Sequence, residues 1–565
     1  MKRSLSGGVF SRRIALACSA AVAAVALSAP ISLSAQDFGF GFERPHFFPG
    51  NLVVSRSVYD NLANNVTVGE QLPPECTAAN CVSATADGTY PFIFNNALVD
   101  GSFGITSRIF LDQITPFGFP INTLEVPNSL LRGISSTSDQ LVTSFSSKSE
   151  LEVHLSTDGQ FLSFGGYVAP VNALDVSNAN TPGVVDPTNP DPGTFFRAAA
   201  RVDVWGHFDF TETNAYSGDN LRAVILNDTT GNPVFYSAGN AGNGSNPQPA
   251  GVVLGAGAQI FDFVEQPESK QAPGQPTPVG NFSVTELGDK ADKVGKDDNF
   301  RGIAIFNHVL YYTKGSGGNG VNTVYFVDTT GTACPNGVGL PSASAALPTT
   351  PFSFNTTTGT PTNICVLAGF PTLSNKNGNP ANFPFGLWFA DANTLYVADE
   401  GDGTAAYDAA TNTYTDAATN PNAGLEKWIF NSTSKTWTLA YTLQKGLDLG
   451  TPYTVPGYPT GTNAATGLPW SPTTDGLRNI VGQVNREGTV TIWAVTSTTS
   501  GGGDTGADPD KLVVITDNLA NTTATGAANE KFFTLRTARF GEVLRGVTFT
   551  PGTGANDGGF LGGLF

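Results

Sequence analysis

Short apolar runs of four to eight residues, each bounded by turn residues, follow one another along the chain from about residue 149. Runs of this length are typical of β-strands. They fall into groups of four, and tight turns such as "TDGQ" or "ADANT" between the first two strands of a group predict β-hairpins. Complete groups occupy the ranges 150–216, 220–287, 300–370, 383–444 and 476–539. The pattern therefore predicts a series of four-stranded antiparallel units.

A further unit is divided between the two ends of the chain. The N-terminal part has predicted strands at 51–60, 107–118 and 121–129 but lacks a first strand, and the C-terminal "LRGVTFTP" at 544–551 resembles the first strand "FRGIAIFN" at 300–307. We therefore predict an all-β fold: a six-bladed β-propeller of four-stranded antiparallel blades. In this prediction the C-terminal strand completes the N-terminal blade and closes the ring, which removes exposed sheet edges.

The segment "FPFGLWFADANTLYVADEGDG" at 383–403 resembles the NHL-type and related six-bladed propellers. Their repeats share its Pro-x-Gly start, its apolar first strand and its "LYVAD" second strand. The resemblance extends more weakly to "FRGIAIFNHVLYYTKG" and "LRGVTFTPG". It implies the repeat skeleton and the arrangement of loops but no activity, because propellers of this kind include binding proteins, lactonases, phytases and lyases.

Composition narrows the class of protein. The chain has 565 residues with 65 glycines and 37 prolines, 40% of its residues are hydrophobic, and its formal net charge is −18. The hydrophobic content is sufficient for a core, and the glycines and prolines suit many turns. The negative charge argues against a nucleic-acid-binding protein, which would carry clusters of basic residues. We expect cations, or a small anionic or carbohydrate ligand, as partners and no nucleic acid.

The first 35 residues have the features of an export signal. A basic start precedes the apolar run "IALACSAAVAAVAL", and small residues follow in "SAPISLSA". The pair Arg12–Arg13 resembles a twin-arginine signal of bacteria, and an ordinary secretory signal is the alternative. No second long apolar segment occurs, so we expect no transmembrane segment and a secreted or periplasmic protein.

These features divide the chain into four parts. We predict a signal peptide at 1–35, an N-terminal extension at 36–50, the propeller at 51–552 and a Gly-rich C-terminal tail at 553–565.

Cysteine usage also fits export. After removal of the signal peptide, Cys76, Cys81, Cys334 and Cys365 remain, and an even number in an exported chain favours disulfides. Closeness in sequence suggests the pairs Cys76–Cys81 and Cys334–Cys365, although three connectivities are possible. A zinc site is the alternative, but the C-x4-C spacing is not one that zinc favours and no histidine is near.

Loop lengths indicate which face of the propeller acts. The loops that lead into first strands, and those that join second to third strands, share one face, called here the upper face. It receives the long segments 61–104, 170–194, 399–424 and 445–475, whereas the other face receives chiefly 329–363. Long loops on a rigid scaffold are common places for function, so the upper face is the candidate. Its aromatic residues, in "YTVPGYP" and Trp470, either stack on sugar rings or cover a small core of the loop itself.

Arginines recur just before the apolar part of several first strands. They are Arg222, Arg301, Arg478 and Arg545. First strands line the channel of a propeller, so these guanidinium groups should converge near its upper mouth, together with Lys314 at the end of a second strand. Guanidinium binds carboxylate or phosphate through paired hydrogen bonds, which predicts an anion-binding funnel. The alternative is that the arginines pin neighbouring blades together by pairing with Asp219, Asp298, Asp475 and Glu542.

The sequence "ADEGDG" at 398–403 places Asp399, Glu400 and Asp402 at the same mouth. Carboxylates beside turn glycines suit Ca²⁺, although the spacing is not that of a full calcium loop and turn formation explains the residues equally well. Calcium is therefore the one cofactor that we consider.

Functions of three classes remain open. The first is a binding protein that recognises an anionic or carbohydrate ligand on its upper face. The second is a calcium-dependent hydrolase, like the phytase- or lactonase-type propellers, acting in the funnel. The third is a structural or assembly component of the cell envelope. The sequence lacks a GxSxG motif, and the Gly-rich "GSGGNG" at 315–320 joins antiparallel strands rather than opening a helix, so it predicts no phosphate loop.

Overall fold

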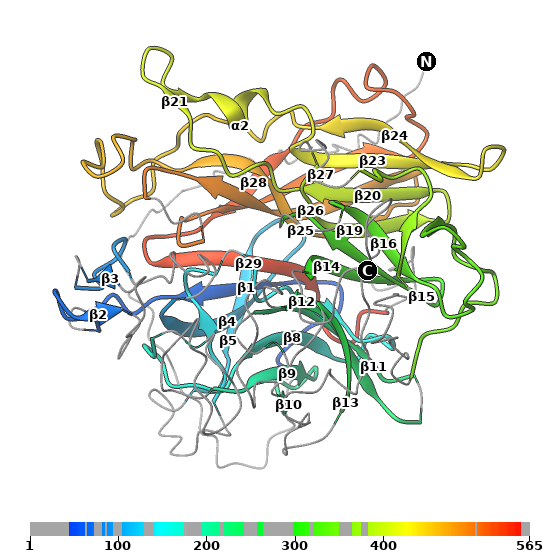
Figure 1. Ribbon diagram of the computed structural model, residues 1–565, viewed down its shortest axis with the longest axis horizontal. Helices are drawn as coiled ribbons and strands as arrows, with labels where there is room; N and C mark the ends of the chain where they lie inside the picture. The colour runs from blue at the N-terminus through cyan, green and yellow to red at the C-terminus, as the bar shows by residue number, and fades with distance from the viewer. Residues whose placement is uncertain are drawn as a thin grey trace, which may run out of the picture. The chain divides into compact units, whose positions relative to one another are not determined.

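The computed structural model (Figure 1) is described for the compact unit Pro45–Phe565. The described residues are 45–554 without the segments 63–64, 73–81, 85–86, 94–103, 129–139, 148, 175, 177–194, 214–215, 217–219, 230, 242–256, 264–297, 317–320, 350–363, 374–381 and 503–505. Residues 1–44 also lie outside the described part, as does the predicted Cys76–Cys81 disulfide.

The described chain is all-β, with antiparallel sheets in a propeller-like arrangement, and its one described helix is the five-residue α2 (Thr415–Thr419). Four sheets contain four strands in series, as predicted. Their strand orders are β29 (Glu542–Phe549)–β1 (Leu52–Val58)–β4 (Thr106–Ile114)–β5 (Pro120–Glu125), with β6 (Thr143–Ser144) on β4; β10 (Phe208–Thr213)–β9 (Arg197–Val202)–β8 (Leu162–Tyr167)–β7 (His154–Leu155); β19 (Pro384–Asp391)–β20 (Thr394–Asp399)–β23 (Gly424–Asn431)–β24 (Thr436–Leu443); and β25 (Thr473–Val484)–β26 (Thr489–Thr499)–β27 (Lys511–Asn518)–β28 (Phe533–Thr537).

The remaining two predicted blades appear as one eight-stranded sheet. Its order is β11 (Leu221–Asn227)–β12 (Val234–Ala241)–β14 (Asp298–Phe306)–β15 (Val309–Lys314)–β16 (Thr323–Val327)–β18 (Ile364–Leu367)–β17 (Val338–Gly339), with β13 (Ala258–Asp262) on β12. The two halves are joined by only two residue pairs between β12 and β14. The strand predicted at 279–287 lies outside the described residues. The described chain thus has four separate blades of the expected kind, and not six.

The two ends of the chain meet in one sheet. Strand β29 pairs antiparallel with β1 from Leu52↔Phe549 to Val58↔Glu542, and β1 pairs on its other side with β4. The red and blue strands lie side by side in Figure 1. The predicted pairing of the C-terminal strand with the N-terminal blade is therefore confirmed.

The innermost strands approach one another so closely that glycine is required at the contact. A Cβ on Gly386 of β19 would lie 2.6 Å from the carbonyl oxygen of Arg478 in β25, closer than such atoms can approach. The same holds for Gly546 of β29, where a Cβ would lie 2.8 Å from the backbone nitrogen of Val153. Neighbouring inner strands are thus held backbone to backbone.

A buried ion pair joins the sheets of β19 and β25 further out. Lys427 of β23 donates to Asp517 of β27 at 2.8 Å, and both side chains are fully buried. Tyr441 also donates to Asp517, at 2.6 Å, and Lys427 donates to the carbonyls of Asn518 and Asn521. Burying an amine this deeply is tolerated because several acceptors surround it.

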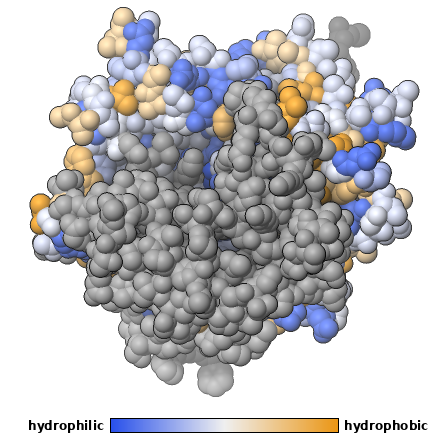
Figure 2. All heavy atoms as spheres, viewed as in Figure 1, coloured by the Kyte–Doolittle hydropathy of each residue, from blue (hydrophilic) through white to orange (hydrophobic). Residues whose placement is uncertain are grey.

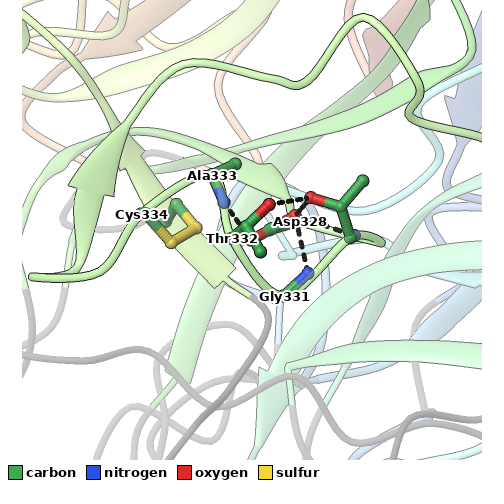
Figure 3. The surroundings of a disulfide bond; sticks show 7 residues. Asp328, Gly331, Thr332, Ala333 and Cys334 are labelled. Atoms are coloured by element: carbon green, nitrogen blue, oxygen red, sulfur yellow. Dashed lines mark hydrogen bonds between the residues drawn. A yellow bond between two sulfur atoms is a disulfide. The ribbon is translucent and has the colours of Figure 1, made fainter.

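The long loop after β16 is closed by the disulfide Cys334–Cys365, as predicted. Figure 3 shows Asp328 beside it, accepting hydrogen bonds from the backbone of Gly331 and Ala333 at 3.1 and 2.7 Å. These hydrogen bonds lower the pKa of Asp328, against the effect of burial. Here the carboxylate orders a turn.

The upper-face loops add the two-stranded hairpins β2 (Gln71–Leu72)–β3 (Val82–Ser83) and β21 (Tyr407–Asp408)–β22 (Thr413–Tyr414).

Removal of β29 should destroy the fold. Strand β29 buries Val543, Leu544 and Val547, and its loss exposes an edge of β1. A chain that stops after residue 540 should lose at least 10 °C in Tm or aggregate, whereas one that stops after residue 554 should behave like the full chain. Thermal unfolding followed by circular dichroism, with size-exclusion chromatography, measures both. A shortened chain that is equally stable and monomeric would contradict the role given to β29.

Candidate functional site

Each of the four recurring arginines lies on an innermost strand, and each is buried. Arg222 is in β11, Arg301 in β14, Arg478 in β25 and Arg545 in β29, with side chains 1–4% exposed. Each arginine thus lies in the strand to which the sequence assigned it, and its contact with a ligand stays a prediction. These four arginines, together with Ser149, Glu150, Glu400 and Asp510, form what we call the axial cluster.

Glu400 connects two of these arginines. Its carboxylate lies 3.6 Å from Nη2 of Arg301 and 3.3 Å from Nε of Arg478, and it follows the last residue of β20. One carboxylate is thus held between guanidinium groups from two different sheets. For this pair of arginines the pinning role that we considered is observed, but with Glu400 as the acid.

The other two arginines bind polar groups of other strands and turns. Arg222 donates to Oγ of Ser149 at 2.8 Å and to the carbonyl of Phe300 at 2.7 Å. Arg545 donates to the carbonyl of Phe145. Each guanidinium therefore connects its own strand to a segment distant in the sequence.

Two buried acids lie near Arg545. Burial raises the pKa of Glu150 to about 7, although Tyr167, Ser144 and the charge of Arg545 oppose this. Burial likewise raises the pKa of Asp510 to about 7, against the hydrogen bond from the amide of Leu544 and the charges of Arg545 and Arg478. The axial cluster therefore contains acids that exchange protons near neutral pH.

The predicted calcium ligands have different neighbours. Asp399 accepts hydrogen bonds from the amides of Phe383 and Gly401 at 2.6 and 2.9 Å, Glu400 faces the arginines, and Asp402 is exposed. The described residues hold one group of three metal-binding side chains with mutually close ligand atoms, Asp328, Cys334 and Cys365, and its cysteines form the disulfide. Calcium at 399–402 stays a prediction.

From the sequence, Asp475 was not predicted to lie beside Asp399, Glu400 and Asp402. It lies opposite the 399–403 loop, where it accepts a hydrogen bond from the amide of Gly403 at 2.9 Å. Burial and the charges of Asp402, Glu400 and Asp399 raise its pKa to about 7, and burial with the neighbouring acids does the same for Asp399. The sequence suggested Asp475 only as an arginine partner.

Lys314 ends β15 as predicted, and it is fully buried. Its Nζ donates to the carbonyl of Ser316 at 2.6 Å and lies 3.5 Å from Oδ1 of Asn322. Its role as a ligand contact stays a prediction.

Of the other suggested arginine partners, the structure describes the side chain of Glu542, which pairs with arginines other than the four recurring ones. Glu542 binds Arg56 at 2.9 Å and lies 3.8 Å from Arg536, in a network that Asp112 completes. Asp219 and the side chain of Asp298 lie outside the described residues.

Several buried polar atoms of this region have no protein hydrogen-bond partner among the residues that the structure describes. On β25 and β26 they are Oγ1 of Thr473, Thr474 and Thr499, Oδ1 of Asp475 and Oδ1 of Asn479; elsewhere they include Oδ2 of Asp510 and Oγ of Ser146. Buried polar groups normally have hydrogen-bond partners, so a group of buried polar atoms without partners in the protein is unusual.

Aromatic residues cover the region beside Arg545. Tyr90 meets Phe145 and Tyr458 edge to face, with ring centroids 5.8 and 5.7 Å apart. Tyr458 is 5% exposed and Trp470 is 7% exposed. Tyr458 and Trp470 are thus buried in a core that the loop shares with Tyr59, Tyr90 and Phe145, and stacking of this loop on sugar rings stays a prediction.

Comparison with known proteins gives no family. No family model matches the chain, and no curated protein matches it. Within the described residues no helix is long and apolar enough to cross a membrane.

Stability should fall as the pH rises from 5 to 8. The folded-state pKa values of Glu150, Asp399, Asp475 and Asp510, each about 7, lie above those of unfolded acids near 4. Between pH 4 and pH 7 the folded chain therefore holds protons on these acids that the unfolded chain has released. The resulting stabilisation of the folded state is complete below pH 4 and is lost as the pH rises through 7. We expect Tm to be higher at pH 5 than at pH 8 by roughly 5 °C.

The variant Asp475→Asn isolates one of these groups. It keeps an acceptor for the amide of Gly403 but cannot ionise, so it should be more stable than the native chain at pH 8 and show a smaller change in Tm between pH 5 and 8. Asp391→Asn, at an exposed position at the far end of β19 from the 399–403 loop, is the matched control and should follow the native profile. An unchanged pH profile in Asp475→Asn would show that the pKa of Asp475 is the same in the folded and unfolded chains.

Proposed function

We propose that this protein is an exported six-bladed β-propeller that binds a ligand bearing a carboxylate or phosphate group at its axial cluster. It acts in this proposal as a binding protein. The cluster of arginines from four inner strands, in which Glu400 is already held between two guanidinium groups, is the observation that carries it.

Contacts between inner strands support six blades and a closed ring. Strand β7 contacts β11, β11 contacts β14, β14 contacts β19, β19 contacts β25, β25 contacts β29, and β29 contacts β7. This cyclic order counts the eight-stranded sheet as two blades, one led by β11 and one by β14. The narrow link of two residue pairs between β12 and β14 agrees with that division.

The chemistry of the cluster supports an anionic ligand. A planar guanidinium prefers a planar anion and binds it through two parallel hydrogen bonds. The buried position of the arginines strengthens such a contact, since water competes less there. The strand of Arg478 also carries Thr473 and Thr474, whose buried hydroxyls have no hydrogen-bond partner among the described residues.

Export is supported by the disulfide. Cys334–Cys365 is a bond that forms and persists in oxidising compartments, which agrees with the predicted signal peptide.

The proposal is tested with Arg545→Gln and Arg301→Gln, using citrate and inorganic phosphate as probes. We expect the native chain to gain Tm with a probe and both variants to bind it at least tenfold more weakly, a loss of about 1.4 kcal/mol. Isothermal titration calorimetry at a temperature where every chain is folded gives the affinities. Arg536→Gln is the control, because Arg536 binds Asp112 outside the axial cluster and should leave the affinity unchanged.

The outcomes separate the alternatives. Variants that lose Tm but keep the native affinity would show that the arginines only pin blades. Stabilisation by micromolar Ca²⁺ that a chelator reverses, with no response to either anion, would favour the calcium-dependent hydrolase instead.

A further inference from the structure

A group of large apolar side chains is exposed at the outer edge of the sheet of β1. Phe117, Phe119 and Ile121 are 78%, 69% and 41% exposed, and Phe533 of the neighbouring sheet is 55% exposed. We call these four residues the edge patch. On the face shown in Figure 2, the apolar residues of the described part are mostly scattered among hydrophilic ones, which is ordinary for a surface. Three exposed aromatic rings gathered at one edge are not.

The edge patch lies on a firmly held turn. The β4–β5 hairpin turns at Gly118, where φ is +87° and the amide donates to the carbonyl of Thr115 at 2.9 Å. The amide of Thr115 donates to the carbonyl of Phe119 at 2.8 Å, and the amide of Phe119 donates to Oγ1 of Thr115 at 3.1 Å. On the buried side, Nε1 of Trp493 donates to the carbonyl of Pro116 at 2.9 Å. The backbone is therefore fixed without any help from the rings of Phe117 and Phe119.

The turn rests on β28, which brings Phe533 into the same patch. A Cβ on Gly118 would lie 3.1 Å from Cβ of Leu535. Phe533 precedes Leu535 by two residues on β28, whose register shifts at Leu535, and the side chain of Phe533 is exposed. The rings thus project from a convex ridge made by the hairpin turn and the start of β28.

Cationic side chains border this ridge. Nζ of Lys531 lies 4.8 Å from the centre of the Phe533 ring. Lys445 is near it, because its carbonyl accepts a hydrogen bond from the amide of Phe532 at 2.8 Å, and its Nζ donates to the carbonyl of Ala528 at 3.0 Å. Arg536 is paired with Asp112, and Glu530 is turned toward the amides of Asn518 and Asn521. The ammonium groups of Lys531 and Lys445 thus lie beside the patch in a chain whose net charge is −18.

We propose that the edge patch docks on a lipid bilayer that contains anionic lipids. Aromatic rings next to lysines suit the boundary between headgroups and acyl chains, where rings are buried and ammonium groups meet phosphates. A convex ridge suits a fluid surface that deforms around it, whereas a protein partner would need a pocket of matching shape. The proposal is independent of ligand binding at the axial cluster.

Co-sedimentation of the full chain with vesicles tests the proposal. Vesicles of phosphatidylcholine alone are compared with vesicles that contain 30% phosphatidylglycerol. We expect binding chiefly to the anionic vesicles, and a fall in the bound fraction of at least fivefold in Phe117→Ser/Phe119→Ser. Lys531→Glu should weaken binding to the anionic vesicles at low salt. Trp205→Ser, at a residue 44% exposed elsewhere, is the control and should bind like the native chain.

Tm measured for every variant shows whether it is folded, and the fixed backbone of the turn predicts a change below about 2 °C for the double variant. Equal binding of native chain and double variant would overturn the proposal. So would the absence of vesicle binding together with a native dimer that the double variant abolishes, because the patch would then contact a second copy of the chain.

Discussion

The close backbone contact between neighbouring inner strands is the constraint on which the rest of the structure depends. At Gly386 and Gly546 even a methyl group would collide with the next strand. Such an approach fixes the relative height of adjacent sheets, because the strands meet at one defined residue and cannot slide past a side chain. The residues just before and after that contact are consequently brought to one level around the axis.

Charged side chains at that level follow from this geometry. Arg545 immediately precedes Gly546, and Arg301 immediately precedes Gly302, where a Cβ would collide with the carbonyl oxygen of Phe385. The guanidinium groups of both arginines are therefore buried beside these close contacts. Burial of an isolated charge is costly, and each buried charge must find partners near it. Glu400 meets this need for two arginines, while backbone carbonyls such as that of Phe145 meet it for Arg545. Burial raises the pKa values of nearby acids; neighbouring acids add to this effect at Asp399 and Asp475, whereas arginines oppose it at Glu150 and Asp510.

Much of this architecture could be predicted from local pattern. The strand runs, the hairpin turns and the return of "FRGIAIFN" as "LRGVTFTP" led to the observed pairing of β29 with β1. The equivalence of the arginines was predictable for the same reason, because each follows from a position within a repeated strand. The Cys334–Cys365 bond was predictable because these two cysteines are neighbours among the cysteines of the sequence.

Partner choice was not predictable, because it depends on how far sheets rotate against one another. Glu542 is three residues before Arg545 in the sequence, yet it binds Arg56 and Arg536 on the other side of β29. Asp475 similarly points to the 399–403 loop rather than to Arg478. Alternation along a strand places residues at odd separation on opposite faces, so sequence neighbours three apart are poor candidates for a pair within one strand. The repeat pattern therefore predicts the strand on which a charged residue lies. Its partner can be identified only when the packing of the adjoining sheet is known.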